Sequence, residues 1–141
     1  MILKEKAGKK IDVEKQKGAD FVNSYLLKHP QAQKTSSGLI YNEVVAGIGA
    51  QPALTNTVTV HYHGTVISGN VFDSSVDRGE PISFPLGQVI KGWQEGVAMM
   101  RVGGKAQLVI PSDLAYGDQG SLPAITPGAT LIFDVEVISF N

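Results

Sequence analysis

The sequence predicts an α+β fold in which an antiparallel β-sheet packs on one short helix, with an amphipathic helix preceding the sheet. Three observations predict this class. Apolar and polar residues alternate in most segments after residue 38, as they do in half-buried strands. One window of helical spacing interrupts these segments, and another precedes them. The 141 residues are 43% hydrophobic and 18% charged, which is typical of one globular domain with a short appendage.

The first predicted element is an N-terminal amphipathic helix. Asp12 is a suitable N-cap, and the helix is expected to end at His29 because Pro30 follows. Residues 31–38 are rich in Gln, Ser and Thr and therefore predict a linker. The apolar face of the helix consists of Phe21, Val22, Tyr25 and Leu26.

The N-terminal region is basic and the rest of the chain is acidic. Residues 1–34 contain eight Lys and four acids, whereas residues 35–141 contain four Lys or Arg and nine acids. Such an arm could contact nucleic acid or anionic lipid. Its lysines are interleaved with acids, however, and no aromatic and basic pattern accompanies them, so we interpret it as a solvated helix face and predict no nucleic-acid partner. The interleaved acids are Glu5, Asp12, Glu14 and Asp20.

Strands are predicted along most of the remaining chain. Residues 57–66 alternate most clearly, and residues 131–138 repeat the pattern near the C-terminus. Residues 105–110, 39–45 and 71–72 supply further strands. The apolar faces of the two clearest strands consist of Val58, Val60, Tyr62 and Val66, and of Leu131, Phe133, Val135 and Val137. In the second strand, Ile132 and Ile138 fall on the opposite face, together with Asp134 and Glu136.

The single helix of the domain is predicted from about residue 88 to residue 100. The residues lining one side of it are Val89, Ile90, Trp93, Val97 and Met100. A helix that covers an antiparallel sheet gives the α+β arrangement.

Several classes of function are excluded by composition. The chain has no Cys, which excludes disulfides, thiolate metal sites and cysteine nucleophiles. No apolar run approaches the ~20 residues of a membrane span, and the first residues lack a signal-peptide pattern. His61 and His63 could contribute to a metal site, but no third ligand is apparent, so solvated histidines are the preferred interpretation and no metal or cofactor is predicted. A hydrolase is disfavoured because no G-x-S-x-G turn is present.

Aromatic residues cluster around turns that contain glycine. They can serve as core or as the lining of a cavity, and for Phe84 the core is the preferred interpretation. Asp73 lies beside apolar residues with Arg78 within reach, which predicts an ion pair. The aromatic set is Tyr62, Phe72, Phe84, Trp93, Tyr116 and Phe133.

Five motifs in order resemble the FK506-binding type of peptidyl-prolyl cis-trans isomerase. They are VHYHG at 60–64, VFDSS at 71–75, VIKGWQEG at 89–96, LAYG at 114–117 and ATLIFDV at 129–135. The resemblance covers residues 37–141 and leaves residues 1–36 as a helical arm and linker. The arm together with SGLIY at 37–41 is similar to the macrophage infectivity potentiator branch of bacterial isomerases.

The resemblance implies a half-open, twisted antiparallel sheet wrapped around one short helix, and a cleft that binds proline. Trp93 would form the floor of this cleft, and Asp73 and Tyr116 would be polar groups at its rim. Tyr62 completes the implied catalytic set. Residues implied to contact substrate or inhibitor are Phe72, Ile82, Val89, Ile90 and Phe133. Ile82 stands where an aromatic residue is common in the family, and the loop 118–127 has its own composition, with Ser121, Leu122 and Pro123 at its tip.

The implied activity is isomerisation of X-Pro bonds in unfolded or extended polypeptides, with no cofactor and no covalent intermediate. The implied inhibitors are macrolides of the FK506 and rapamycin type. The implied compartment is the periplasm or the outer-membrane surface, with the cytoplasm as the alternative, and a longer form of the chain would form a homodimer. The alternative function is a peptide-binding chaperone module with little catalysis.

Overall fold

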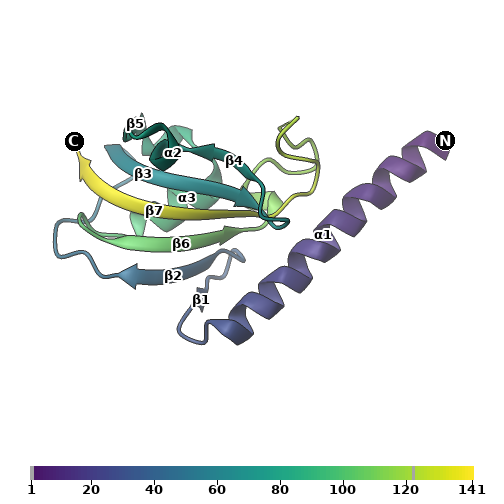
Figure 1. Ribbon diagram of the computed structural model, residues 1–141, viewed down its shortest axis with the longest axis horizontal. Coiled ribbons are helices and arrows are strands. Elements are labelled where there is room, and N and C mark those ends of the chain that lie inside the picture. The colour runs from purple at the N-terminus through teal and green to yellow at the C-terminus, as the bar shows by residue number, and fades with distance from the viewer. Residues whose placement is uncertain (1, 122) are drawn as a thin grey trace.

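The computed structural model describes residues 2–121 and 123–141, with side chains from residue 10 onward (Figure 1). Its elements in chain order are α1 Ile2–Lys28, β1 Gln33–Lys34, β2 Ile40–Val45, β3 Thr57–Val66, β4 Val71–Ser74, α2 Ser75–Arg78, β5 Ile82–Pro85, the 3-10 turn η1 Leu86–Gln88, α3 Lys91–Ala98, β6 Lys105–Ile110, the 3-10 turn η2 Ser112–Leu114 and β7 Leu131–Phe140.

The strands form one open antiparallel sheet in the order β1-β2-β6-β7-β3-β4, and β5 also pairs with β3. The two longest strands, β3 and β7, are neighbours, with Val60 opposite Val137 and Tyr62 opposite Val135. β4 and β5 pair with different parts of the same edge of β3, and α2, which connects them, is hydrogen-bonded to β3. The predicted α+β class with an open antiparallel sheet is confirmed.

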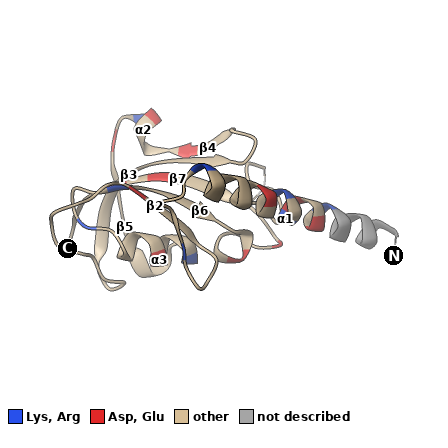
Figure 2. Ribbon diagram, turned by 90° about the horizontal axis from the view of Figure 1, so that it is seen from below, with Lys and Arg blue, Asp and Glu red and all other residues tan. Residues whose placement is uncertain are grey.

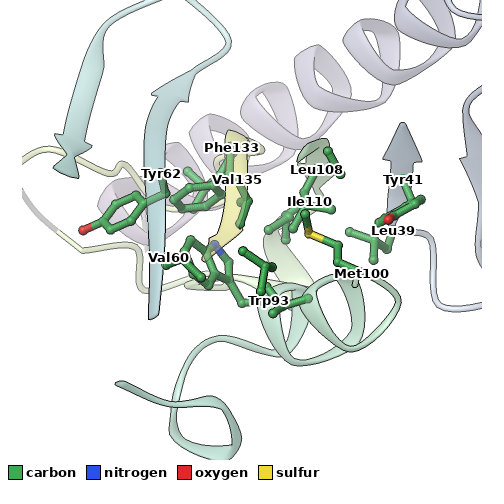
Figure 3. Packing of buried hydrophobic residues seen from close by; sticks show 14 of the residues in the cluster. Leu39, Tyr41, Val60, Tyr62, Trp93, Met100, Leu108, Ile110, Phe133 and Val135 are labelled. Carbon is green, nitrogen blue, oxygen red and sulfur yellow. The ribbon is translucent and has the colours of Figure 1, made fainter. Parts of the chain in front are cut away.

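Helix α3 packs closely against one face of the sheet. A Cβ atom on Gly92 would lie 2.4 Å from Ile110 Cγ2, and one on Gly96 would lie 2.7 Å from a Leu108 methyl carbon. Glycine therefore brings the helix axis near the strands, and this places Trp93 in the middle of the core with 3% of its surface exposed. Figure 3 shows Trp93 below the strands that carry Val60, Tyr62, Phe133 and Val135.

The opposite face of the sheet is partly covered by the C-terminal part of α1. Val22 and Tyr25 of this helix pack with Ile40, Val109 and Ile132, each of which alternates with a residue of the main core. The sequence analysis placed Ile132 on the face opposite the apolar one, with Asp134, Glu136 and Ile138. Ile138 is 40% exposed on that face, whereas Ile132 is 8% exposed because α1 lies over it.

Three predicted boundaries differ from the structure. Asp12 is not an N-cap, because α1 begins at Ile2 and continues through it. The strong helix formers Lys, Glu and Ala that precede Asp12 favour this extension. The predicted linker contains β1, which pairs with β2. The predicted helix at 88–100 is divided into η1 and the shorter α3.

Candidate functional site

A cleft of about 350 Å³ opens beside α3, where β3, β4, β7 and the segment before α3 converge. The structure brings together every predicted site residue except Ile82. It also adds two residues that the sequence analysis did not assign to the site, Phe84 and Gln88. The lining residues are Tyr62, Phe72, Asp73, Phe84, Gln88, Val89, Ile90, Trp93, Tyr116 and Phe133.

The floor of the cleft is an aromatic cluster centred on Trp93. Its ring lies edge-on to those of Tyr62, Phe133 and Phe84, with centroid separations of 5.3, 5.2 and 5.2 Å. Edge-to-face contacts of this kind are favourable and fix ring orientation. The cluster therefore presents a rigid apolar surface for a small ring of a ligand (Figure 3).

One wall is built from β4 and β7, and the opposite wall from the segment before α3. The rings of Phe72 and Phe133 meet edge-on at 5.4 Å. Val89 lies between η1 and α3, and the Gln94 side-chain amide donates a hydrogen bond of 2.7 Å to its carbonyl. Gln94 thus holds the Val89 wall against the helix that carries Trp93. The sequence analysis gave Gln94 no role, since its one signal was membership in the 89–96 motif.

The polar part of the cleft is a hydrogen-bonded network of three side chains, Tyr62, Asp73 and Arg78. The Tyr62 hydroxyl donates a short hydrogen bond to Asp73 Oδ2, and Arg78 Nη1 lies 2.5 Å from Asp73 Oδ1. The guanidinium also donates to the Tyr62 hydroxyl at 3.3 Å and lies over its ring. The predicted ion pair between Asp73 and Arg78 is confirmed.

These contacts lower the pKa of Asp73 and raise the pKa of Tyr62. Partial burial alone would raise the pKa of Asp73, but hydrogen bonds from Tyr62 and Arg78 and the positive charge of Arg78 outweigh it, so the pKa is lowered. Burial, together with the bond to the Asp73 carboxylate, raises the pKa of Tyr62. At neutral pH, Asp73 is therefore a carboxylate and Tyr62 a neutral donor.

The helical turn α2 is attached to β3 through two serines. The Ser75 hydroxyl accepts a hydrogen bond from the Tyr62 backbone N–H at 2.7 Å, and Ser74 caps α2 by accepting from the Asp77 N–H. His61 Nδ1 lies 2.9 Å from Ser75 Oγ, and His63 Nδ1 lies 2.8 Å from Ser74 Oγ. The histidines thus hold the segment that carries Asp73 and are hydrogen-bonded to the protein instead of freely solvated. Among the described residues, no group of three or more His, Cys, Asp or Glu side chains is arranged to hold a metal ion.

Tyr116 follows η2 and stands at the rim of the cleft with 41% of its surface exposed. The turn after it is held by a bond from Gly117 N–H to Ser112 O and one from Gly120 N–H to Tyr116 O. Ser121 forms a bridge with Ile125 in the same loop, and Leu122 lies outside the described residues.

Ile82 does not line the cleft. It pairs with Val60 in the ladder between β5 and β3 and is 37% exposed. Phe84, two residues further along β5, contacts Trp93 instead. The preferred interpretation of Phe84 as core was incomplete, since Phe84 packs on the core and also lines the cleft.

The arrangement is suited to binding a compact apolar group next to a polar amide. Aromatic rings surround the cleft, and a phenol and a carboxylate stand at its edge. Across the described ranges 2–121 and 123–141, no helix is long and apolar enough to cross a membrane.

Comparison with known proteins agrees with this geometry. Residues 49–138 match the family described as FKBP-type peptidyl-prolyl cis-trans isomerase. The chain is 51% identical over 114 residues to a probable FKBP-type isomerase of Haemophilus influenzae, covering 81% of the chain and 47% of that protein. It is 46% identical over 142 residues to the FKBP-type isomerase FkpA of Aeromonas hydrophila, covering 99% of the chain and 52% of that protein.

A solved structure shares the same arrangement. The crystal structure of FkpA from Escherichia coli superposes with a TM-score of 0.92 at 43% identity, covering 98% of this chain and 64% of that one. The chain spans about half the length of the curated relatives that it matches. The matched residues, the shared fold and the aromatic cleft together show that this chain belongs to the family of FKBP-type peptidyl-prolyl cis-trans isomerases.

Proposed function

We propose that the chain accelerates cis-trans isomerisation of X-Pro bonds, with the proline ring seated on Trp93. The observation that carries this proposal is the floor of the cleft, where three aromatic rings surround Trp93 at 5.2 to 5.3 Å. A flat, rigid and apolar surface fits a pyrrolidine ring, and the cleft volume of about 350 Å³ is suited to a short stretch of extended chain.

The reaction needs no bond to be made or broken. Rotation about the X-Pro bond faces a barrier of ~18–20 kcal/mol because amide resonance is lost in the twisted state. Water stabilises the planar, charge-separated form by hydrogen bonding to the amide oxygen. Transfer of the amide to the apolar cleft removes that stabilisation, and the aromatic walls hold the twisted ring by shape.

The polar groups bind and orient the substrate in this proposal. The exposed Tyr116 hydroxyl can donate to the carbonyl that precedes proline. The backbone N–H of Ile90, at the start of α3, can donate to a carbonyl of the substrate or inhibitor. Asp73 fixes the Tyr62 ring through their hydrogen bond and places negative charge near the rotating carbonyl.

The proposed substrates are proline-containing polypeptides in unfolded or extended form, and the proposed inhibitors are macrolides of the FK506 and rapamycin type. Both would occupy the same cleft. The second candidate function is a peptide-binding chaperone module with little catalysis. The exposed apolar residue Val71, which precedes the cleft residue Phe72 on β4, favours it, since it could contact an extended chain.

The decisive experiment measures cis-to-trans conversion of a short X-Pro peptide with and without the chain, then repeats it with FK506. Acceleration that the inhibitor abolishes supports the isomerase and its cleft together. Binding of the peptide to folded protein without acceleration would instead support the binding module.

The compartment is a separate part of the proposal. We place the full protein in the periplasm or at the outer-membrane surface, because the resemblance to the macrophage infectivity potentiator branch implies export. Fractionation of cells, with detection by an antibody against this chain, distinguishes this compartment from the cytoplasm.

A further inference from the structure

Helix α1 contacts the loop that begins at Tyr116. We call residues 116–121 and 123–130 the tyrosine loop, since Tyr116 is its first residue and lines the cleft. Figure 1 shows this loop between the end of the sheet and α1, with the N-terminal end of the helix projecting away from the domain. The contacts between the two involve both the beginning and the end of the loop.

At the end of the loop, the backbone of Gly18 lies against Thr130. Both residues are buried, and a Cβ atom on Gly18 would lie 2.2 Å from Thr130 Oγ1. Glycine inside a helix costs about 0.5–1 kcal/mol relative to Ala. At this position the absence of a side chain is what allows the helix to approach the loop.

At the beginning of the loop, Lys15 Nζ lies 2.7 Å from Asp118 Oδ1. One helical turn earlier, α1 approaches the loop backbone, because a Cβ atom on Gly128 would lie 3.1 Å from the Ile11 carbonyl oxygen. The Gly128 N–H donates to the Gly117 carbonyl at 2.9 Å and so joins the two ends of the loop. Helix α1 therefore contacts a closed loop at three places.

Hydrogen bonds and core packing connect the tyrosine loop to the cleft. The Tyr116 carbonyl accepts from Gly120, and the Gly117 N–H donates to Ser112. Ala129, next to Thr130, belongs to the core cluster that contains Trp93. We propose that α1 is a positioning element for the proposed isomerase site, with Gly18 and Lys15 holding the tyrosine loop so that Tyr116 stays at the rim. This inference rests on the proposed function.

The sharpest test is a double-mutant cycle on the Gly18 contact. In Gly18→Ala the new Cβ overlaps Thr130 Oγ1, so we expect faster amide hydrogen exchange at Gly117, Gly120 and Gly128 and a weaker affinity for an X-Pro peptide. In a Thr130→Ala background that oxygen is gone and the nearest atom lies 3.1 Å away, so the same substitution should have a much smaller effect. Gln16→Ala, at an exposed position on α1, is the matched control.

A second test uses the ion pair and is independent of packing. Lys15→Glu should raise exchange in the tyrosine loop by about two- to fivefold, the range expected for an exposed ion pair. The charge swap with Asp118→Lys should restore it. Lys28→Glu, which makes the same charge change in the last turn of α1 and away from the loop, should leave it unchanged. Figure 2 shows that Lys and acidic residues occur at several places along the described part of α1. The amide of Val137, which is fully buried in β7 and donates to the Gly104 carbonyl, reports any global loss of stability.

The outcomes separate the two proposals. Faster exchange confined to the tyrosine loop, with weaker peptide binding and rescue in the paired variants, supports the positioning role. Unchanged exchange and affinity in folded Gly18→Ala and Lys15→Glu proteins overturn it. Hydrogen exchange is measured without substrate and therefore tests the contact between α1 and the loop whether or not the chain is active. Failure of the wild-type chain to accelerate isomerisation would contradict only the proposed function.

Discussion

At the scale of single residues, the cleft combines an aromatic floor with one ion-paired carboxylate. Trp93 contacts three other rings, whereas Asp73 contacts Tyr62 and Arg78 at the edge. The floor provides the surface on which a proline ring would rest. The ion-paired group fixes the wall residue Tyr62, so the two residues are expected to contribute to different degrees.

We expect Trp93→Leu to lower kcat/KM by about tenfold or more, which corresponds to about 1.4 kcal/mol of lost transition-state stabilisation. Leu keeps an apolar side chain at this position but provides no flat ring. Asp73→Ala should lower kcat/KM less, because it leaves the aromatic floor in place and removes the group that orients Tyr62 together with its negative charge. The peptide assay measures both, with circular dichroism to verify the fold. Full activity in both folded variants would contradict the assignment of the site.

The pH profile of kcat/KM provides another test at this scale. The pKa of Asp73 is lowered from its ordinary acidic value, and the pKa of Tyr62 is raised from its ordinary alkaline value. Neither group changes its protonation between about pH 6 and 8. We expect kcat/KM to vary little across this range. A steep sigmoid within this range would contradict the assignment of Asp73 and Tyr62 as the polar groups of the site.

At the scale of elements, α1 is attached to the outer face of the sheet by a polar network as well as by apolar contacts. The Tyr25 hydroxyl donates to Gln107 on β6 at 2.5 Å and accepts from the Asn42 amide on β2 at 3.0 Å. Gln107 in turn donates to Asp134 on β7. This network joins the helix to three strands.

Tyr25→Phe should therefore lower the free energy of unfolding by about 1–3 kcal/mol, because it leaves the Asn42 amide, which is 5% exposed, without its acceptor. Urea denaturation measures the change. Leu27→Ala is a control on the same helix, since Leu27 is 85% exposed and its truncation should change stability by less than about 0.5 kcal/mol. Equal stability of the Tyr25→Phe and wild-type proteins would mean that the network contributes nothing to docking of the helix.

The elements also show where periodicity succeeds as a predictor. The strand at 57–66 was predicted with its observed bounds, because both strand faces have a distinct environment along most of its length. Ile132 shows what alternation within a strand cannot predict. Alternation placed it on the face that also carries Asp134, Glu136 and Ile138, and its burial depends on a helix more than a hundred residues away in the chain.

At the scale of the whole molecule, three tyrosines make stability depend on alkaline pH. Burial, with a smaller effect from the Glu43 charge, raises the pKa of Tyr41 to about 12, and burial also raises the pKa values of Tyr25 and Tyr62. A tyrosine whose pKa is higher in the folded than in the unfolded state stabilises the protein at pH values below the unfolded-state pKa, which is near 10. This stabilisation is lost as the pH rises through the folded-state pKa.

We therefore expect the urea midpoint to fall between about pH 10 and 12. Tyr41→Phe should reduce this fall, because Phe has no proton to lose. The measurement is a series of urea titrations from pH 8 upward. A midpoint that falls equally in Tyr41→Phe and wild-type proteins would assign the alkaline loss to other groups.

The candidate site shows the same division between local and tertiary information. The motifs identified Tyr62, Phe72, Asp73, Trp93 and Tyr116, and the structure brings all five to one cleft. The sequence analysis assigned Ile82 to the site and preferred the core for Phe84, whereas in the structure Phe84 lines the cleft and Ile82 does not. Both lie on β5, and only the pairing of that strand with β3 decides which of them reaches Trp93.

The sequence by itself determined the α+β class, most of the strands and most of the residues that line the cleft, because these depend on local periodicity and on short motifs. Tertiary structure alone decided how α1 lies on the sheet and against the tyrosine loop. These contacts join Gly18 to Thr130 and Lys15 to Asp118, pairs separated by more than a hundred residues. Nothing in the local pattern of either segment specifies its partner, because close packing depends on shapes that exist only once the chain has folded.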